Sequence, residues 1–209
     1  MIRHFLDQNS TVTSVKVCGL CDEENIDIAV ASGANAIGFV FVEESPRFVE
    51  RHLADQFMLQ LPDDVTGVAV LQNATSLEPY TTWGGWLQLC GDEDEHTVIT
   101  APCPVIKALQ WNKDEILRWD GCTNLAAILV DGSTGGLGIS FDVTELATLI
   151  PTLQTPIIIA GGLTPETVQE VITKANPAGV DVSSGVENSL GIKDPEKICA
   201  FIQKVQEAN

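Results

Sequence analysis

Short apolar runs alternate with longer segments of mixed polarity along most of the chain. The runs have the length and composition of buried strands, and they lie at residues 15–18, 36–41, 65–71, 86–89, 105–109, 126–130, 156–160 and 179–182. Each run is followed by a segment that favours a helix or a short helical turn, at 22–32, 57–61, 76–82, 92–98, 114–119, 142–149, 165–174 and 194–206. Thr164 is the expected N-cap of the seventh helix.

Eight strand–helix units in succession define the expected architecture. Strands that are apolar along their whole length are typical of parallel sheets buried on both faces, and repeated strand–helix units favour an α/β fold. We therefore predict a single-domain (β/α)8 TIM barrel with parallel strands at 15–209, preceded by an N-terminal extension at 1–14. A doubly wound open sheet is the alternative. Its glycine fingerprint would lie in the first strand–helix turn, where this chain has only Gly19.

Composition and charge narrow the classes of partner. The chain has 209 residues, 44% hydrophobic and 19% charged, which suits one globular domain. Its net charge of −18, from 11 basic and 29 acidic residues, argues against nucleic acid. No apolar run reaches the ~18 residues of a membrane span, and the N-terminus lacks the apolar core of a secretory signal. Because the six cysteines have no disulfide spacing, we expect a cytoplasmic protein with reduced thiols, either a monomer or a homodimer.

Two glycine-bearing turns follow the last two predicted strands, at 159–163 and 180–187. Small residues there let backbone N–H groups approach a ligand, and a helix after each turn points its positive end the same way. In a (β/α)8 barrel this is where a phosphate group is held. Any α/β protein needs tight turns, so it is the pairing that indicates a function. The predicted binding residues are Gly161, Gly162, Asp181, Ser183, Ser184 and Gly185.

Catalytic groups in such a barrel lie at the C-terminal ends of strands. Cys18 ends the first strand and Asp131 the sixth, so we expect them to face each other across the barrel mouth as a base and an acid. Arg47, just past the second strand, offers a bidentate fork for a carboxylate or a phosphate. Cys90 and Lys107 also lie at strand ends. The structural alternatives are a buried packing residue for Cys18, a turn or helix cap for Asp131, and a solvated surface side chain for Arg47.

Seven motifs occur in the order found in one known family. The chain resembles phosphoribosylanthranilate isomerases at 15–20, 36–41 with 45–47, 87–93, 105–108, 129–131 with 135–138, 160–166 and 181–187. The resemblance runs from Val15 to about Val205. It implies a (β/α)8 barrel that catalyses an Amadori rearrangement in tryptophan biosynthesis. This reaction is an aldose–ketose isomerisation of a small phosphosugar substrate, and it uses no metal or cofactor.

The resemblance also implies roles for individual residues. Asp131 would be the general acid that protonates the ribose ring oxygen and opens the ring to a Schiff base. Cys18 would be the general base that takes the C2′ proton to give an enolamine, which tautomerises to the ketone. Arg47 would hold the anthranilate carboxylate. Backbone groups of five residues would hold the phosphate: Gly161, Gly162, Ser183, Ser184 and Gly185.

The chain departs from the family pattern at several positions. Cys90 stands where histidine is usual, Cys21 where threonine is usual, and Leu137 fills the third position of the glycine cluster at 135–138. A non-catalytic or altered-specificity paralogue that binds a phosphosugar is therefore the alternative function. Aminoaldose isomerases of the histidine pathway share the phosphate turns but use aspartate at the position of Cys18.

Cys18 and Cys21 also form a C-x-x-C motif. No second C-x-x-C and no histidine pair completes a zinc site, and a thioredoxin-like site needs a different fold. Because Cys18 directly precedes a helix N-terminus, a setting that favours the thiolate, one hypothesis is that it oxidises to a disulfide with Cys21. The competing interpretation is that Cys21 packs between strand and helix as a small apolar residue.

Overall fold

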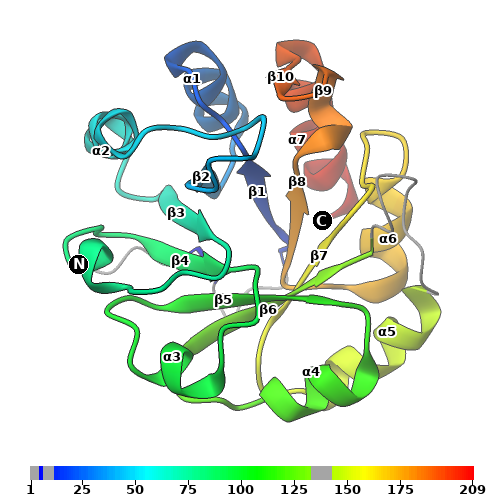
Figure 1. Ribbon diagram of the computed structural model, residues 1–209. Helices are drawn as coiled ribbons and strands as arrows, with labels where there is room; N and C mark the ends of the chain where they lie inside the picture. The colour runs from blue at the N-terminus through cyan, green and yellow to red at the C-terminus, as the bar shows by residue number, and fades with distance from the viewer. Residues whose placement is uncertain (1–4, 7–11, 133–142) are drawn as a thin grey trace.

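Eight parallel strands close into a barrel in the computed structural model, which describes residues 5–6, 12–132 and 143–209. The strands follow one another round the ring in chain order and β8 pairs with β1, while the helices lie around the outside (Figure 1). The strands are β1 (Ser14–Cys18), β2 (Ala36–Val40), β3 (Thr66–Leu71), β4 (Trp86–Leu89), β5 (Val105–Gln110), β6 (Leu125–Asp131), β7 (Ile157–Ala160) and β8 (Gly179–Val182). The predicted TIM barrel is confirmed.

Seven α-helices are present in the described residues. They are α1 (Glu23–Ser32), α2 (Arg51–Gln60), α3 (Glu95–Ile99), α4 (Lys113–Trp119), α5 (Val143–Leu149), α6 (Val168–Ala175) and α7 (Pro195–Ala208). Three short 3-10 helices, η1 (Glu78–Tyr80), η2 (Ile150–Thr152) and η3 (Ser184–Val186), complete the set. None of these helices has the length and apolarity needed to cross a bilayer. The glycine cluster at 135–138, with Leu137, lies outside the described residues.

Side-chain caps explain where the helices beside β1 begin. The Asp22 carboxylate accepts a hydrogen bond from the N–H of Asn25 at 2.9 Å and starts α1, which ends at Gly33 with φ 104°. Asp194 starts α7 in the same way, accepting from the N–H of Glu196 at 2.9 Å. Because α1 and α7 pack against each other, the two caps stabilise the wall where the barrel closes.

Three local features differ from the predictions. The second helix, predicted at 57–61, spans Arg51–Gln60. The seventh predicted helix, α6, begins at Val168 rather than 165, and its N-cap is Thr167 rather than Thr164. The reason is a turn between them, in which the N–H of Thr164 donates to the Thr167 hydroxyl at 3.0 Å. After β8, the chain also forms an antiparallel hairpin of β9 (Glu187–Ser189) and β10 (Ile192–Lys193), which the sequence pattern did not predict.

Alternate residues of each strand face two different cores. In β1, Val15 and Val17 pack outward in the layer shared with the helices, whereas Lys16 and Cys18 face the barrel interior. The interior core contains Cys18, Ala36, Val40, Val68, Val70, Trp86, Ile106, Ala127, Leu129, Ile158 and Ala160. This alternation decides which strand residues can reach a ligand at the mouth, because only inward-facing residues near the C-terminal strand ends open onto it.

The base of the barrel is filled from the N-terminal segment. Phe5 and Leu6 are 2% and 7% exposed and belong to the interior core. The Phe5 ring meets Trp86 edge-on at 5.8 Å between centroids, and the Phe5 carbonyl accepts from the Ser14 hydroxyl at 3.1 Å. The division into an extension at 1–14 and a barrel at 15–209 stays a prediction, but these two residues belong to the barrel's core and β1 begins at Ser14.

Truncating the buried side chain of Phe5 should destabilise the fold. Phe5→Ala is expected to lower the free energy of unfolding by about 3 kcal/mol, because truncating a buried phenylalanine loses its transfer free energy and leaves a cavity. Leu59→Ala is the control, since Leu59 is 88% exposed and should change stability by less than about 0.5 kcal/mol. Urea unfolding monitored by circular dichroism measures both. Equal stabilities would mean that the segment does not pack on the barrel in solution.

Candidate active site

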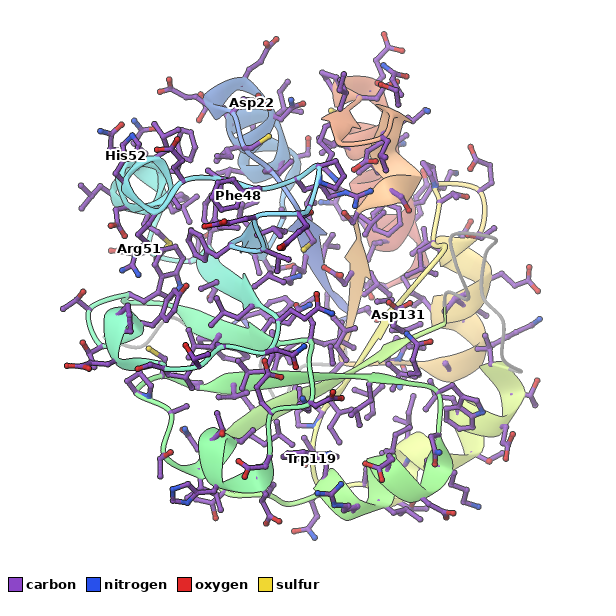
Figure 2. All side chains as sticks on the ribbon, in the orientation of Figure 1. Asp22, Phe48, Arg51, His52, Trp119 and Asp131 are labelled. Carbon is purple, nitrogen blue, oxygen red and sulfur yellow. The ribbon has the colours of Figure 1, made fainter. Side chains whose placement is uncertain are left out.

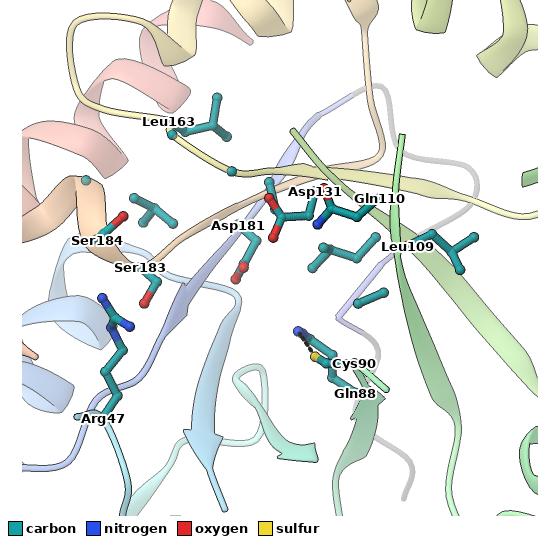
Figure 3. A pocket seen from close by; sticks show the side chains of 17 residues that line it. Arg47, Gln88, Cys90, Leu109, Gln110, Asp131, Leu163, Asp181, Ser183 and Ser184 are labelled. Atoms are coloured by element: carbon teal, nitrogen blue, oxygen red, sulfur yellow. Dashed lines mark hydrogen bonds between the residues drawn. The ribbon is translucent and has the colours of Figure 1, made fainter. Parts of the chain in front are cut away.

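One cavity of about 330 Å³ opens at the C-terminal ends of the strands. Its walls come from the loop after β2, from β4, β5 and β6, and from the turns after β7 and β8. Figure 3 shows Arg47, Asp131 and Asp181 around it, with Ser183 and Ser184 on the β8 side. The structure thus brings together the following predicted residues around one cavity: Arg47, Asp131, Gly161, Gly162, Asp181, Ser183, Ser184 and Gly185.

The two glycine-bearing turns form one continuous wall of this cavity. Gly161 and Gly162 adopt φ values of 85° and 70°, which L side chains rarely adopt. Gly185 lies so close to the first turn that a Cβ there would be 1.8 Å from the carbonyl oxygen of Leu163. Within the part of the chain that the structure describes, the backbone N–H groups of Gly161, Gly162 and Ser184 donate to no other residue. Three such donors in one cavity wall can bind an anion.

Arg47 lies at the rim but its fork is already occupied. Its Nε donates to Glu187 Oε1 at 2.6 Å and its Nη2 to Oε2 at 2.9 Å. Lys193 Nζ donates to the same Oε1 at 2.9 Å. Burial opposes ionisation of Glu187, but hydrogen bonds from Arg47 and Lys193 lower its pKa to about 2. The side edge of the Arg47 guanidinium, Nε with one N–H of Nη2, therefore binds Glu187. The outer edge, Nη1 with the second N–H of Nη2, remains for a substrate carboxylate.

Cys18 is buried in the barrel interior beside a buried ion pair. It is 6% exposed and does not line the cavity itself. Lys16, two residues earlier on the same face of β1, is fully buried, and its Nζ donates to Asp181 Oδ1 at 2.6 Å. Although burial disfavours the charged form of Lys16, Asp181 raises the Lys16 pKa above its ordinary value.

The expectation that the following helix favours a Cys18 thiolate is wrong. The N-cap of α1 is Asp22, four residues further on, and the thiol faces the interior instead of the helix. Burial raises the pKa of Cys18, and Lys16 is the largest influence in the opposite direction. Cys21 packs against the outer core, whereas Cys18 belongs to the interior core, and both are free thiols. This placement favours Cys21 as a packing residue over a disulfide with Cys18.

Asp131 is positioned at the last residue of β6 and lines the cavity. Figure 2 shows it where the ends of β6 and β7 lie next to each other. Its neighbours in strand register are Gln110 of β5 and Ala160 of β7, so it stands next to the first glycine turn. A carboxyl group in this place can donate a proton to a ligand whose phosphate lies at that turn.

Two further residues that were predicted at strand ends, Cys90 and Lys107, have different surroundings. Cys90 lines the cavity, and Gln88 Nε2 donates to its sulfur at 3.2 Å (Figure 3). Burial raises the pKa of Cys90 to about 11, so this thiol is neutral at physiological pH. Lys107 faces away from the cavity. Its Nζ donates to the Gly91 carbonyl at 2.5 Å and to Glu93 at 3.1 Å, so it is not available to a ligand.

Sequence reasoning missed the buried charges that surround the predicted residues. Lys16, Glu187 and Lys193 are buried and paired with groups of the site. A lysine within an apolar strand was the available signal for Lys16, because lysine is almost never fully buried unless it is paired.

The fold is a (β/α)8 barrel, and its cavity lies at the C-terminal ends of the strands, where enzymes of this fold have their active sites. A family model described as N-(5'phosphoribosyl)anthranilate (PRA) isomerase matches residues 15–204. The chain belongs to this family of isomerases. An N-(5'-phosphoribosyl)anthranilate isomerase of Dechloromonas aromatica is 34% identical over 94% of this chain and 98% of its own.

Solved structures give the same assignment. The phosphoribosyl anthranilate isomerase of Thermotoga maritima matches with a TM-score of 0.83 at 31% identity, over 94% of this chain and all of its own. A phosphoribosyl anthranilate isomerase in complex with reduced 1-(o-carboxyphenylamino)-1-deoxyribulose 5-phosphate also matches with a TM-score of 0.83, at 29% identity over the same shares of the two chains. The family and the isomerase activity predicted from the motifs are confirmed.

Proposed function

We propose that this chain converts N-(5′-phosphoribosyl)anthranilate into 1-(o-carboxyphenylamino)-1-deoxyribulose 5-phosphate, an Amadori rearrangement of tryptophan biosynthesis. The observation that carries the proposal is a single cavity in which N–H groups of the two glycine turns, without a partner among the described residues, stand beside Asp131. A phosphosugar fits this arrangement, with its phosphate on the turns and its ring oxygen toward the carboxyl group. A cytoplasmic location and a monomeric or homodimeric state stay predictions.

The phosphate is held mainly by backbone groups. The net charge of −18 repels an anion at long range, so affinity must come from groups that touch the phosphate. The N–H groups of Gly161, Gly162 and Ser184 supply oriented partial positive charges without a side chain that needs ordering. Ser183 adds a hydroxyl near the second turn, where Lys193 Nζ donates to the Ser183 carbonyl at 2.9 Å.

Asp131 and Cys18 carry the two proton transfers. Asp131, as a general acid, donates its proton to the ribose ring oxygen; the C1′–O bond breaks and the nitrogen lone pair forms the Schiff base. Cys18, as a general base, then removes the C2′ proton, and the electron pair of that C–H bond forms the C1′–C2′ double bond of the enolamine. Tautomerisation places a proton on C1′ and yields the ketone. Every atom of the substrate is retained, as an isomerisation requires.

Turnover by the purified chain tests the function directly. Because substrate and product are isomers, the assay separates them by chromatography, and borohydride reduction marks the new ketone. Formation of the ketone at a rate proportional to enzyme concentration supports the isomerase. Binding of the phosphosugar without turnover would instead favour the non-catalytic paralogue.

Arg47 is expected to hold the anthranilate carboxylate through its outer edge. Arg47→Ala should raise KM by about 10- to 100-fold, since a charge-assisted hydrogen bond contributes roughly 1.5–3 kcal/mol. Arg47→Lys should recover only part of this, because an ammonium cannot contact a substrate carboxylate with two parallel N–H groups. Steady-state kinetics on the three proteins measures the effect.

Glu187→Gln separates substrate binding from the pairing within the protein. This change removes the charge that Arg47 pairs with but leaves the guanidinium in place. If Arg47 contacts the substrate, Glu187→Gln should raise KM much less than Arg47→Ala. Equal effects of the two substitutions would mean that Arg47 acts only as the partner of Glu187.

A further inference from the structure

We propose that Lys16 is a positioning residue of the reaction: its ammonium group, fixed by Asp181, stabilises the Cys18 thiolate and so makes a buried thiol usable as a base. The inference rests on the proposed function, in which Cys18 removes the C2′ proton. It adds a residue to which neither the motifs nor the strand-end positions assign a role. It also gives Asp181 a contact within the protein in addition to its place in the cavity wall.

The burial of Lys16 needs a reason. It is one of the largest fully buried side chains of the described residues, at 0% exposure, in an interior that is otherwise mostly apolar. Replacing a buried ion pair with apolar residues of similar volume is often neutral or stabilising, so stability alone is a weak explanation. The pair with Asp181 at 2.6 Å holds the ammonium on the inward face of β1, two residues from Cys18, where successive inward side chains are neighbours.

A buried thiol has a specific need for such a cation. Removing Cys18 from water opposes its ionisation, which is why burial raises the Cys18 pKa. A general base works only when it is deprotonated. A fixed ammonium beside the sulfur supplies the compensating charge, and after proton transfer the neutral thiol leaves the Lys16–Asp181 pair intact. The Lys16–Asp181 pair is therefore compatible with both the thiolate and the neutral thiol of Cys18.

The other charges that face Cys18 are arranged differently. Asp181, on β8, opposes ionisation of the thiol, and Lys193, on β10, favours it more weakly than Lys16. Arg47, on the loop after β2, and the neutral Cys90, on the β4 side, also interact with it. Arg47 and Lys193 are both committed to Glu187. Lys16 is thus the cation that most strongly favours the thiolate form of Cys18.

Titration of the thiol tests the inference without relying on turnover. Thiolate absorbance in the ultraviolet is recorded against pH for the wild type and for Cys18→Ser, and the difference isolates Cys18 from the other thiols. The same pair is prepared with Lys16→Met. We expect Lys16→Met to move the midpoint at least one pH unit more alkaline, a tenfold smaller thiolate fraction at neutral pH, and the pH profile of kcat to move in the same direction. Lys16→Arg should restore most of the shift.

Two further variants keep the test decisive. Lys193→Met removes a cation that favours the Cys18 thiolate more weakly than Lys16 and leaves Glu187 paired with Arg47, so it should move the midpoint less than Lys16→Met. Lys16→Met combined with Asp181→Asn removes the unpaired carboxylate if the single variant does not fold, and should still move the midpoint upward. An unchanged midpoint without Lys16, or an equal shift from Lys193→Met, overturns the inference. Full turnover by Cys18→Ser would instead refute the base assigned in the proposed function. That outcome is seen in the activity assay and not in the thiol titration.

Discussion

Asp131→Asn and Cys18→Ser should each lower kcat by at least about 10²-fold, the contribution typical of a general acid or base. Asparagine keeps the size and a hydrogen-bond donor at the end of β6 but has no acidic proton for the ring oxygen. Serine keeps the shape at the end of β1, but its hydroxyl is a far weaker base than a thiolate. Affinity for inorganic phosphate should change little, because the glycine turns are untouched. Steady-state kinetics and phosphate inhibition measure the two quantities.

The two variants should also fail at different steps. Cys18→Ser can still open the ring, so a Schiff base should accumulate that borohydride reduces to an open-chain amine. Asp131→Asn should yield much less of this amine because ring opening itself is slow. Asp64→Asn and Cys199→Ser make the same chemical changes at exposed positions and should keep wild-type rates. Near-normal turnover by Asp131→Asn or Cys18→Ser would remove that residue from the mechanism.

The fold could be predicted from the sequence because strand identity is a local property here. Each barrel strand is a short apolar run, and these runs survive in the structure with boundaries shifted by a residue or so. Helix starts were predictable where a side chain caps them, as at Asp22. The start of α6 was not, because Thr164 and Thr167 are both capable caps and the turn between them decides the outcome.

The site was only partly predictable, because its pairings join distant parts of the chain. Strand ends and glycine turns place Asp131 and Gly161 correctly at the cavity. The partners of charged residues follow no local rule: Arg47 and Glu187 are 140 residues apart, and Lys16 and Asp181 are 165 apart. Whether an arginine is open to a substrate or a lysine is buried depends on these contacts.

Lys107 shows that the face of the strand on which a side chain lies decides its role. Its strand neighbours Ile106 and Ala108 pack with the interior core, so Lys107 must face the helices. There its Nζ lies 5.7 Å from the centre of the Trp119 ring, which Figure 2 shows outside the strands. The prediction that Lys107 lies at a strand end was wrong, because it is the third residue of β5 (Val105–Gln110), and the direction of its side chain was not considered. A strand-end residue is a catalytic candidate only on the inward face.

Gly185→Ala should lower kcat/KM by at least about 10²-fold, because it separates the two turns that we propose hold the phosphate. The new Cβ would lie 1.8 Å from the Leu163 carbonyl oxygen and 2.9 Å from its carbon, and both neighbours are backbone atoms that cannot rotate away. One turn must therefore move by more than 1 Å. A displacement of that size at a substrate anchor costs roughly 10²-fold in rate, since the reacting atoms no longer meet Asp131 and Cys18 in the right geometry.

The matched control is another glycine-to-alanine change. Gly84 has φ 73°, so alanine strains the backbone there, but no described atom lies within 4 Å of the new Cβ. Gly84→Ala should therefore lose some stability and keep its kcat/KM, which distinguishes a general loss of folding from a damaged phosphate site. Inorganic phosphate should inhibit the Gly84→Ala protein as it inhibits the wild type, and Gly185→Ala should lose most of this inhibition. Wild-type kcat/KM and phosphate inhibition in folded Gly185→Ala would show that the phosphate binds away from these turns.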